Sequence, residues 1–324
     1  MIYRALPARI RLMAVAVSLT FNVCLSQTTD DTRGLKPREY ARQLHNKIAK
    51  GRPRSNRSQK TVPVKYVSVA SDNSLVPEGV DVGITFWRLR EARKADDQAV
   101  VEQTRIVKRV KGKSVESTAR MTAERAAAEA AWSDGDMLRM SIEAPFDCFI
   151  YILNQERYAD GTFSDQYLVF PANVDIKWSA RGAPGKLVYV PSEPDYFEVT
   201  SLNTEGREKT AEVFTILLTS KALETLPALA DQDSNRKVDA QLFEQLRRDY
   251  ETRVWRFENM AAAKTSITKM EKKAGATSGK MLTESDPDPQ TVYHVACRPG
   301  SSLLITVPVK IRKRSQPQDA NRHG

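Results

Sequence analysis

The amino-acid sequence predicts a mainly β fold, an antiparallel β-sandwich with one or two helical insertions. Apolar and polar side chains alternate over residues 80–86 and 138–142, which is the pattern of half-buried strands. Further apolar runs of strand length lie at 149–153, 167–170, 187–190, 213–218 and 303–309. Turn-forming sequences separate most of these segments, at Asp134-Gly135, Asp160-Gly161, Gly182 to Gly185 and Pro299-Gly300. Because long helices do not alternate with the strands, we expect antiparallel sheets and not a parallel α/β sheet.

Two segments of the body are predicted to be helical. Residues 119–131 are rich in Ala and Glu and end at Trp132. Residues 238–262 carry an apolar stripe at helical spacing, made of Val238, Leu242, Leu246, Tyr250, Val254 and Phe257. We expect this second helix to pack on the sandwich. No repeat of fixed period is present, which argues against a solenoid or a propeller.

Residues 1–26 have the pattern of a secretory signal peptide. Three arginines precede a mostly apolar run from Leu12 to Leu25, and the small residues Cys24 and Ser26 stand before the expected cleavage site. The alternative is an uncleaved membrane anchor, but the run is short of the roughly 20 apolar residues that a spanning helix needs, and Asn22 interrupts it. The protein is therefore expected to be exported, and periplasmic or secreted after cleavage.

The positive charge of the chain is concentrated near its ends. The sequence has 50 Lys and Arg against 40 Asp and Glu, a net charge of +10. Residues 27–60 alone carry +7 and residues 310–324 carry +4, whereas residues 61–309 carry −4. We interpret residues 27–62 as a basic flexible linker, with a short amphipathic helix as an alternative for its Tyr40 to Ile48 stretch, and residues 310–324 as a basic disordered tail. Such tails make weak contacts with anionic lipid or simply aid solubility. Nucleic acid is not expected as a partner, because the tails lack interleaved aromatic residues.

Signal cleavage would leave two cysteines, Cys148 and Cys297, in a compartment where thiols are oxidised. A disulfide between them would close a long loop and stabilise the fold by about 4 kcal/mol on the chain-entropy model. The alternative is that they are two small core residues that do not meet.

The sequence offers no recognisable catalytic, cofactor-binding or metal-binding residues. His294 is the one histidine of the body and lies in a predicted strand, where a structural role is expected. Two separated cysteines do not form a zinc site. Two glycine-containing segments, 182–186 and 275–280, have the wrong glycine spacing for a phosphate-binding loop.

The loop from Asp160 to Asp165 is the candidate contact site of the body, together with Tyr158. It lacks the acids and the closing Glu of a calcium-binding loop, so a hairpin turn is predicted. A rival interpretation uses Glu156, Asp160 and Asp165 as acid and base in the hydrolysis of an envelope polymer. Carboxylates that converge in a deep cleft would favour that rival.

Several strings also resemble the bacterial DUF4384 domain, over roughly residues 80 to 309. They are VGITFWRLR at 82–90, GDMLRMSIE at 135–143, YILNQERYADGT at 151–162, YLVFP at 167–171 and DPDPQTVY at 286–293. The resemblance implies a β-rich domain, which we place at residues 63–309, of undetermined function in exported or envelope proteins and without agreed catalytic residues. Cys148 and Cys297 depart from the pattern of that domain, which adds weight to the disulfide.

From these observations we expect an exported, non-catalytic binding or scaffold module of the bacterial cell envelope, with an envelope protein or polymer as its partner. The alternatives are the polymer hydrolase and a membrane-anchored structural protein. No cofactor is expected.

Overall fold

The computed structural model describes residues 78–312, except 111–112, 128–129, 172–180, 224–225, 227–236, 260–261, 277–278 and 284. The predicted signal peptide, the linker and residues 313–324 of the tail lie outside the described residues. Within the described residues no helix has both the length and the apolar character that a membrane crossing requires.

The described strands form two antiparallel sheets, which confirms the predicted fold class. Sheet 1 has the order β12-β13-β1-β3-β2. Strand β4 pairs with the edge of β1 that faces away from β13 and β3, and β8 and β9 pair in turn with β4. Its strands are β1 (Val80–Glu91), β2 (Glu102–Val110), β3 (Lys113–Ala126), β4 (Met137–Glu143), β8 (Leu187–Val190), β9 (Phe197–Glu198), β12 (Val254–Glu258) and β13 (Thr291–Val295). The long β1 organises this sheet, because its first half pairs with β13 and its second half with β3.

Sheet 2 has the order β11-β6-β5-β10-β14, with β7 paired to β5. Its strands are β5 (Cys148–Tyr158), β6 (Gln166–Phe170), β7 (Arg181–Gly182), β10 (Lys209–Thr219), β11 (Lys237–Val238) and β14 (Leu303–Lys310). All seven apolar segments that were predicted to be strands lie in strands of one sheet or the other.

The two sheets pack face to face over one apolar core. Val82, Ile84 and Phe86 of β1 share this core with Ile216 of β10 and Ile305 of β14. Along β1, β10 and β14 the same alternation places residues two apart in the core, as expected for a sandwich. Burial between the sheets therefore explains the period of two that the sequence shows.

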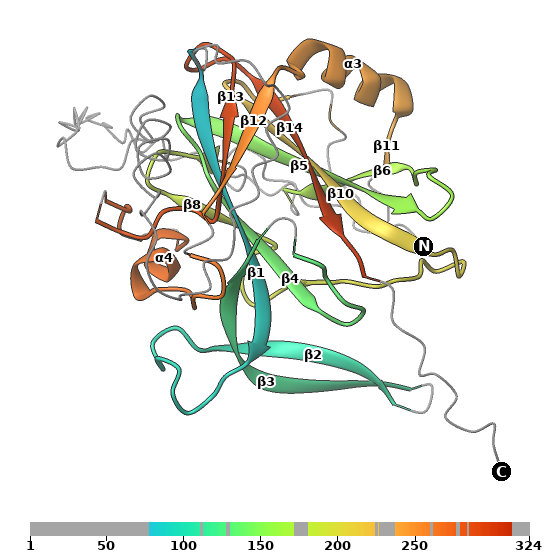
Figure 1. Ribbon diagram of the computed structural model, residues 1–324, viewed down its shortest axis with the longest axis vertical. Helices are drawn as coiled ribbons and strands as arrows, with labels where there is room; N and C mark the ends of the chain where they lie inside the picture. The colour runs from blue at the N-terminus through green and yellow to red at the C-terminus, as the bar shows by residue number, and fades with distance from the viewer. Residues whose placement is uncertain are drawn as a thin grey trace, which may run out of the picture. The chain divides into compact units, whose positions relative to one another are not determined.

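Helix α3 (Ala240–Tyr250) covers the outer face of sheet 2, where Leu246 packs with Tyr151 and Leu217 (Figure 1). This confirms the first half of the helix predicted at 238–262 and its packing on the sandwich. The second half of that prediction was wrong, because the backbone becomes extended at Glu251 and residues 254–258 form β12. The β-branched and aromatic residues of Val254–Glu258 suit a strand that pairs with β13.

The helix predicted at residues 119–131 was also wrong. Residues up to Ala126 belong to β3, which pairs with β1 on one side and β2 on the other. Met121 and Ala123 are buried beside Trp87 on the outer face of sheet 1. Pairing on both edges and burial at every second residue outweigh the helix propensity of Ala and Glu, which amounts to only a few tenths of a kcal/mol per residue.

A second helix, α4 (Lys269–Ala274), covers the outer face of sheet 1 and was not predicted. Thr268 begins it with a capping box. The hydroxyl of Thr268 accepts from the backbone N–H of Glu271 at 3.2 Å, and the carboxylate of Glu271 accepts from the backbone N–H of Thr268 at 2.9 Å. The backbone of Gly275 then passes so close to Tyr189 that a Cβ atom there would lie 2.0 Å from the ring. This close approach requires glycine at that position.

Candidate functional site

The predicted contact residues Tyr158 and Asp160 lie on the turn between β5 and β6. The backbone N–H of Tyr158 donates to the carbonyl of Thr162 at 2.9 Å, and Gly161 adopts a φ of 84°. An oxygen of Asp160 accepts from the backbone N–H and the hydroxyl of Thr162, at 2.9 and 2.6 Å. These bonds confirm the hairpin turn and hold it in one conformation.

A second turn, at residues 201–208, lies beside the first. The backbone N–H of Ala159 donates to the carbonyl of Glu208 at 3.0 Å, which joins the two turns directly. The side-chain oxygen of Asn203 accepts from the backbone N–H groups of Glu205 and Arg207, at 3.0 and 2.8 Å. We call residues 158–165 and 201–208 together the loop-pair surface.

Arg207 ties the two turns together from the solvent side. Its guanidinium lies 3.6 Å from the ring centre of Tyr158 and donates to Asp160 at 3.1 Å and to Thr162 at 2.7 Å. The hydrogen bonds from Thr162, and then the charge and hydrogen bond of Arg207, lower the pKa of Asp160 below its ordinary value. The carboxylate is therefore held ionised at the surface.

Below this surface lies a half-buried cluster of charged residues. The hydroxyl of Tyr158 donates to Glu156 at 2.8 Å, and the ammonium of Lys209 lies 3.1 Å from Glu156 and 2.7 Å from Glu212. Burial alone would lower the pKa of Lys209, but the charges of Glu212 and Glu156 outweigh it and raise the pKa. Burial and the bond to Glu156 raise the pKa of Tyr158. Lys209 stays charged, and the cluster forms a fixed base for the two turns.

Asp165 does not join Tyr158 and Asp160 but pairs with Lys237 at 2.7 Å, at the start of β11. The structure thus brings two of the three predicted contact residues together. The side chains of Asp160 and Asp165 are 58 % and 53 % exposed, and each is in an ion pair. Glu156 forms an ion pair with Lys209 and accepts a hydrogen bond from the hydroxyl of Tyr158. Each of the three carboxylates of the hydrolase interpretation therefore forms an ion pair with a basic side chain: Asp160 with Arg207, Asp165 with Lys237 and Glu156 with Lys209.

Two apolar residues of the loop-pair surface were missed by the sequence analysis. Phe163 is 49 % exposed and Leu202 is 53 % exposed, one on each turn. Arg157 lies over the ring of Phe163 at 5.9 Å. In the part of the chain that the structure describes, Met281 is the other large apolar residue with comparable exposure, at 40 %. A large apolar residue within each polar turn was the signal in the sequence that could have revealed the pair.

His294 is buried, as expected for a structural residue. Its Nδ1 lies 2.6 Å from a carboxylate oxygen of Asp81, with which it forms a cross-strand pair between β13 and β1. Trp255 lies on its other side, with ring centres 5.8 Å apart. The exposed fraction of both His294 and Asp81 is 2 %, so the pair is closed to a substrate in this structure.

The two cysteines of the body are free thiols in this structure. Cys148 is buried in the core between the sheets, and Cys297 packs against the same core from a half-buried position. Burial, followed by the negative charge of Asp147, raises the pKa of Cys148 to about 12, and burial raises the pKa of Cys297. The disulfide stays a prediction for the oxidised protein.

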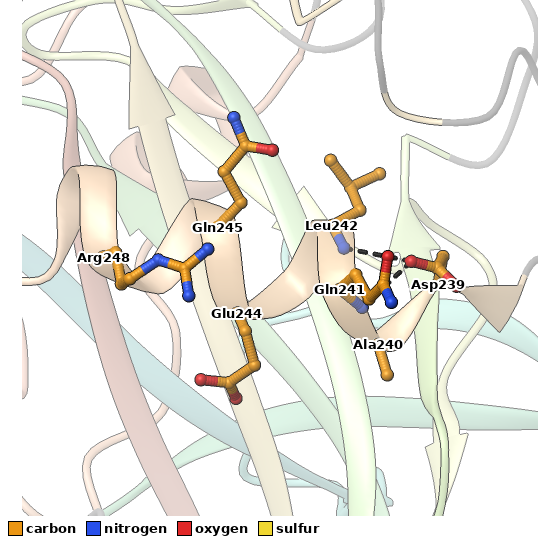
Figure 2. A pocket seen from close by; sticks show the side chains of 7 residues that line it. All are labelled: Asp239, Ala240, Gln241, Leu242, Glu244, Gln245 and Arg248. Atoms are coloured by element: carbon orange, nitrogen blue, oxygen red, sulfur yellow. Dashed lines mark hydrogen bonds between the residues drawn. The ribbon is translucent and has the colours of Figure 1, made fainter.

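A surface depression runs along the outer side of α3 (Figure 2). All of its lining residues come from one stretch, Asp239 to Arg248, and the two hydrogen bonds drawn there cap the helix, from the backbone N–H groups of Gln241 and Leu242 to Asp239. No second element contributes a group, so this depression is an ordinary helix surface. Among the described residues, no three His, Cys, Asp or Glu side chains are grouped as metal ligands.

Comparison of the chain with protein-family models, with curated proteins and with solved structures finds no match. The similarity to the DUF4384 domain therefore stays a prediction from the residue strings alone.

Proposed function

We propose that the protein is an exported, non-catalytic binding module that contacts an envelope protein through the loop-pair surface. One observation carries this proposal: Phe163 and Leu202 are each about half exposed on adjacent turns that are fixed to one another. Exposed apolar side chains within a polar rim are a usual feature of protein interfaces.

The rigidity of the two turns supports binding. Arg207 and Asn203 hold the turns with side-chain hydrogen bonds, and the buried Lys209 cluster supports them from below. A surface that is already ordered loses little conformational entropy when a partner docks, so more of the contact energy appears as affinity. The partner is a protein because the two exposed side chains are apolar, whereas envelope polymers present mainly hydroxyl and charged groups.

Two further observations support the non-catalytic and exported parts of the proposal. The acids of the hydrolase interpretation are neutralised by Arg207, Lys237 and Lys209. The first 26 residues have the charge, apolar run and small residues of a cleaved signal.

The test is the double variant Phe163→Ser with Leu202→Ser, expressed as the full chain in the cells that make the protein. After chemical crosslinking of the intact envelope, adducts of the wild-type protein are identified by mass spectrometry. We expect at least one reproducible protein adduct, which the double variant reduces about thirtyfold, since two interface residues of about 1 kcal/mol each are lost and about 1.4 kcal/mol corresponds to a tenfold change in affinity.

The matched control is Met281→Ser, which removes the third exposed apolar side chain from a different surface. Both variants should unfold at nearly the wild-type temperature, because exposed substitutions usually change stability by less than about 0.5 kcal/mol. An adduct that the loop-pair variant and the control retain equally, or recovery of the monomer alone, would contradict the proposal.

A further inference from the structure

Two segments on the outer face of sheet 1 together carry more basic than acidic residues, within a slightly acidic body. Residues 92–100 contain two Lys or Arg and two Asp or Glu, and residues 262–283 contain five Lys and one Glu. Together the two segments carry +4, whereas the body from 61 to 309 as a whole has a net charge of −4. The charge of the body is therefore unevenly distributed.

Direct contacts hold these two segments on the same side of the sheet. Lys269 at the start of α4 pairs with Asp97 in the β1–β2 connection at 3.1 Å. Lys272 donates to the carbonyl of Val100 at 3.5 Å. Figure 1 shows α4 to the left of β1, level with the label of that strand, with the β1–β2 connection and the β2–β3 hairpin below it. We call the exposed residues of segments 92–100 and 262–283 the basic face.

The acids of the basic face are occupied, whereas many of its bases point to solvent. Glu271 is buried against Arg125, Asp96 pairs with Arg90 at 2.8 Å, and Asp97 pairs with Lys269 at 3.1 Å. The hydrogen bond from Arg90 lowers the pKa of Asp96 well below its usual range. The exposed bases are Arg93, Lys94, Lys264, Lys269, Lys273 and Lys280, of which Lys269 pairs with Asp97. The potential that reaches solvent from this face is therefore positive.

We propose that the basic face docks the folded body on the surface of an anionic phospholipid bilayer. A polarised charge distribution orients a protein at such a surface, and each Lys or Arg close to it contributes about 1 kcal/mol. Single-stranded nucleic acid is disfavoured because the exposed residues of this face include no aromatic side chain for base stacking.

This inference goes beyond the proposed function, because it concerns a different surface and a different class of partner. It also differs from the sequence analysis, which placed lipid contacts only in the basic tails. The test must therefore separate the face from the tails while the full chain is used.

The test variant combines Lys264→Glu, Lys273→Glu and Lys280→Glu, and the control variant combines Lys221→Glu, Arg248→Glu and Arg298→Glu. All six side chains are exposed, and both variants change the net charge equally with the tails intact. Binding is measured by co-sedimentation with phosphatidylcholine vesicles that do or do not contain phosphatidylglycerol, at several salt concentrations.

We expect the wild-type protein to bind the anionic vesicles in a salt-sensitive manner and to bind neutral vesicles poorly. The test variant should lose about a hundredfold in partition coefficient, from a factor of about five for each lysine removed, and the control variant should lose much less. Equal losses in the two variants would assign binding to the tails and overturn the proposal. If the wild-type protein bound duplex or single-stranded DNA but did not bind the anionic vesicles, the proposal would also be overturned.

Discussion

Replacement of Glu271 by Ala tests whether the side chains between α4 and the outer face of sheet 1 form a buried layer. The side chains of Glu271 and Arg125 are 4 % and 1 % exposed and form an ion pair. Arg125 also donates to the carbonyl of Asp288 at 2.5 Å and lies over the ring of Trp87 at 5.2 Å. Without the carboxylate, a buried guanidinium would lack its counter-charge.

The expected loss is the sum of two effects. Removal of one partner of a buried ion pair usually costs about 3–5 kcal/mol. Glu271 also accepts from the backbone and hydroxyl of Thr268, both at 2.9 Å, so the start of α4 loses part of its cap, which adds up to about 1 kcal/mol. We therefore expect Glu271→Ala to lower the free energy of unfolding by about 4 kcal/mol, or the melting temperature by about 10 °C.

The assay is urea unfolding of the full chain, followed by tryptophan fluorescence. The matched control is Glu244→Ala on α3, which removes an ion pair to Arg247 whose side chains are 53 % and 42 % exposed and should cost at most about 0.5 kcal/mol. A second variant, Glu271→Leu combined with Arg125→Met, should recover much of the loss because no charge is then buried alone. If Glu271→Ala cost less than about 1 kcal/mol, like the control, the buried layer under α4 would be refuted.

Three further predictions concern export and the cysteines. Edman sequencing of exported material should give a mature chain that begins near Gln27, and a chain that keeps residues 1–26 would support the anchor instead. The pKa of Cys148 is about 12 in the folded protein against an ordinary value of 9.0, so the thiol loses its proton at lower pH in the unfolded state. The free energy of unfolding should therefore fall as pH rises from 9 towards 12, by at most about 1.4 kcal/mol per pH unit. Cys148→Ala should remove that part of the slope, and an unchanged slope would contradict the raised pKa. Protein isolated without reductant and denatured with an alkylating reagent should show no free thiol if the predicted disulfide forms, whereas two labelled cysteines would exclude it.

The strands were predictable because burial between two sheets imposes a period of two on the sequence. Val82, Ile84 and Phe86 alternate with polar or small residues, and the same residues line the core. The helix prediction for residues 119–131 was wrong because the Ala and Glu content of the segment reflects only local helix propensity. Its conformation is decided by pairing with β1 and β2. In the same way, the stripe from Val238 to Phe257 suits a helix throughout, but its last part pairs with β13.

The candidate site was predictable only in part. Asp160-Gly161 predicts a turn, and the turn carries Tyr158 and Asp160. The neighbouring turn is about 40 residues further along the chain, and nothing local in the sequence shows that Arg207 reaches Asp160. The basic face was not predicted for the same reason, because its two segments are separated by about half of the chain. Its acids are also neutralised by contacts that only the fold creates.

The most direct test of the central claim is a site-specific photo-crosslinking experiment. A photoreactive phenylalanine replaces Phe163 in one full-length protein and Thr306 in another, and each is activated in the intact envelope of the producing cells. Thr306 is the control because it is exposed on β14, outside the loop-pair surface. The account predicts that position 163 gives a discrete protein adduct that position 306 does not, and that Arg207→Ala weakens it because the two turns are no longer tied together. The same adducts from both positions, or none from position 163, would contradict it.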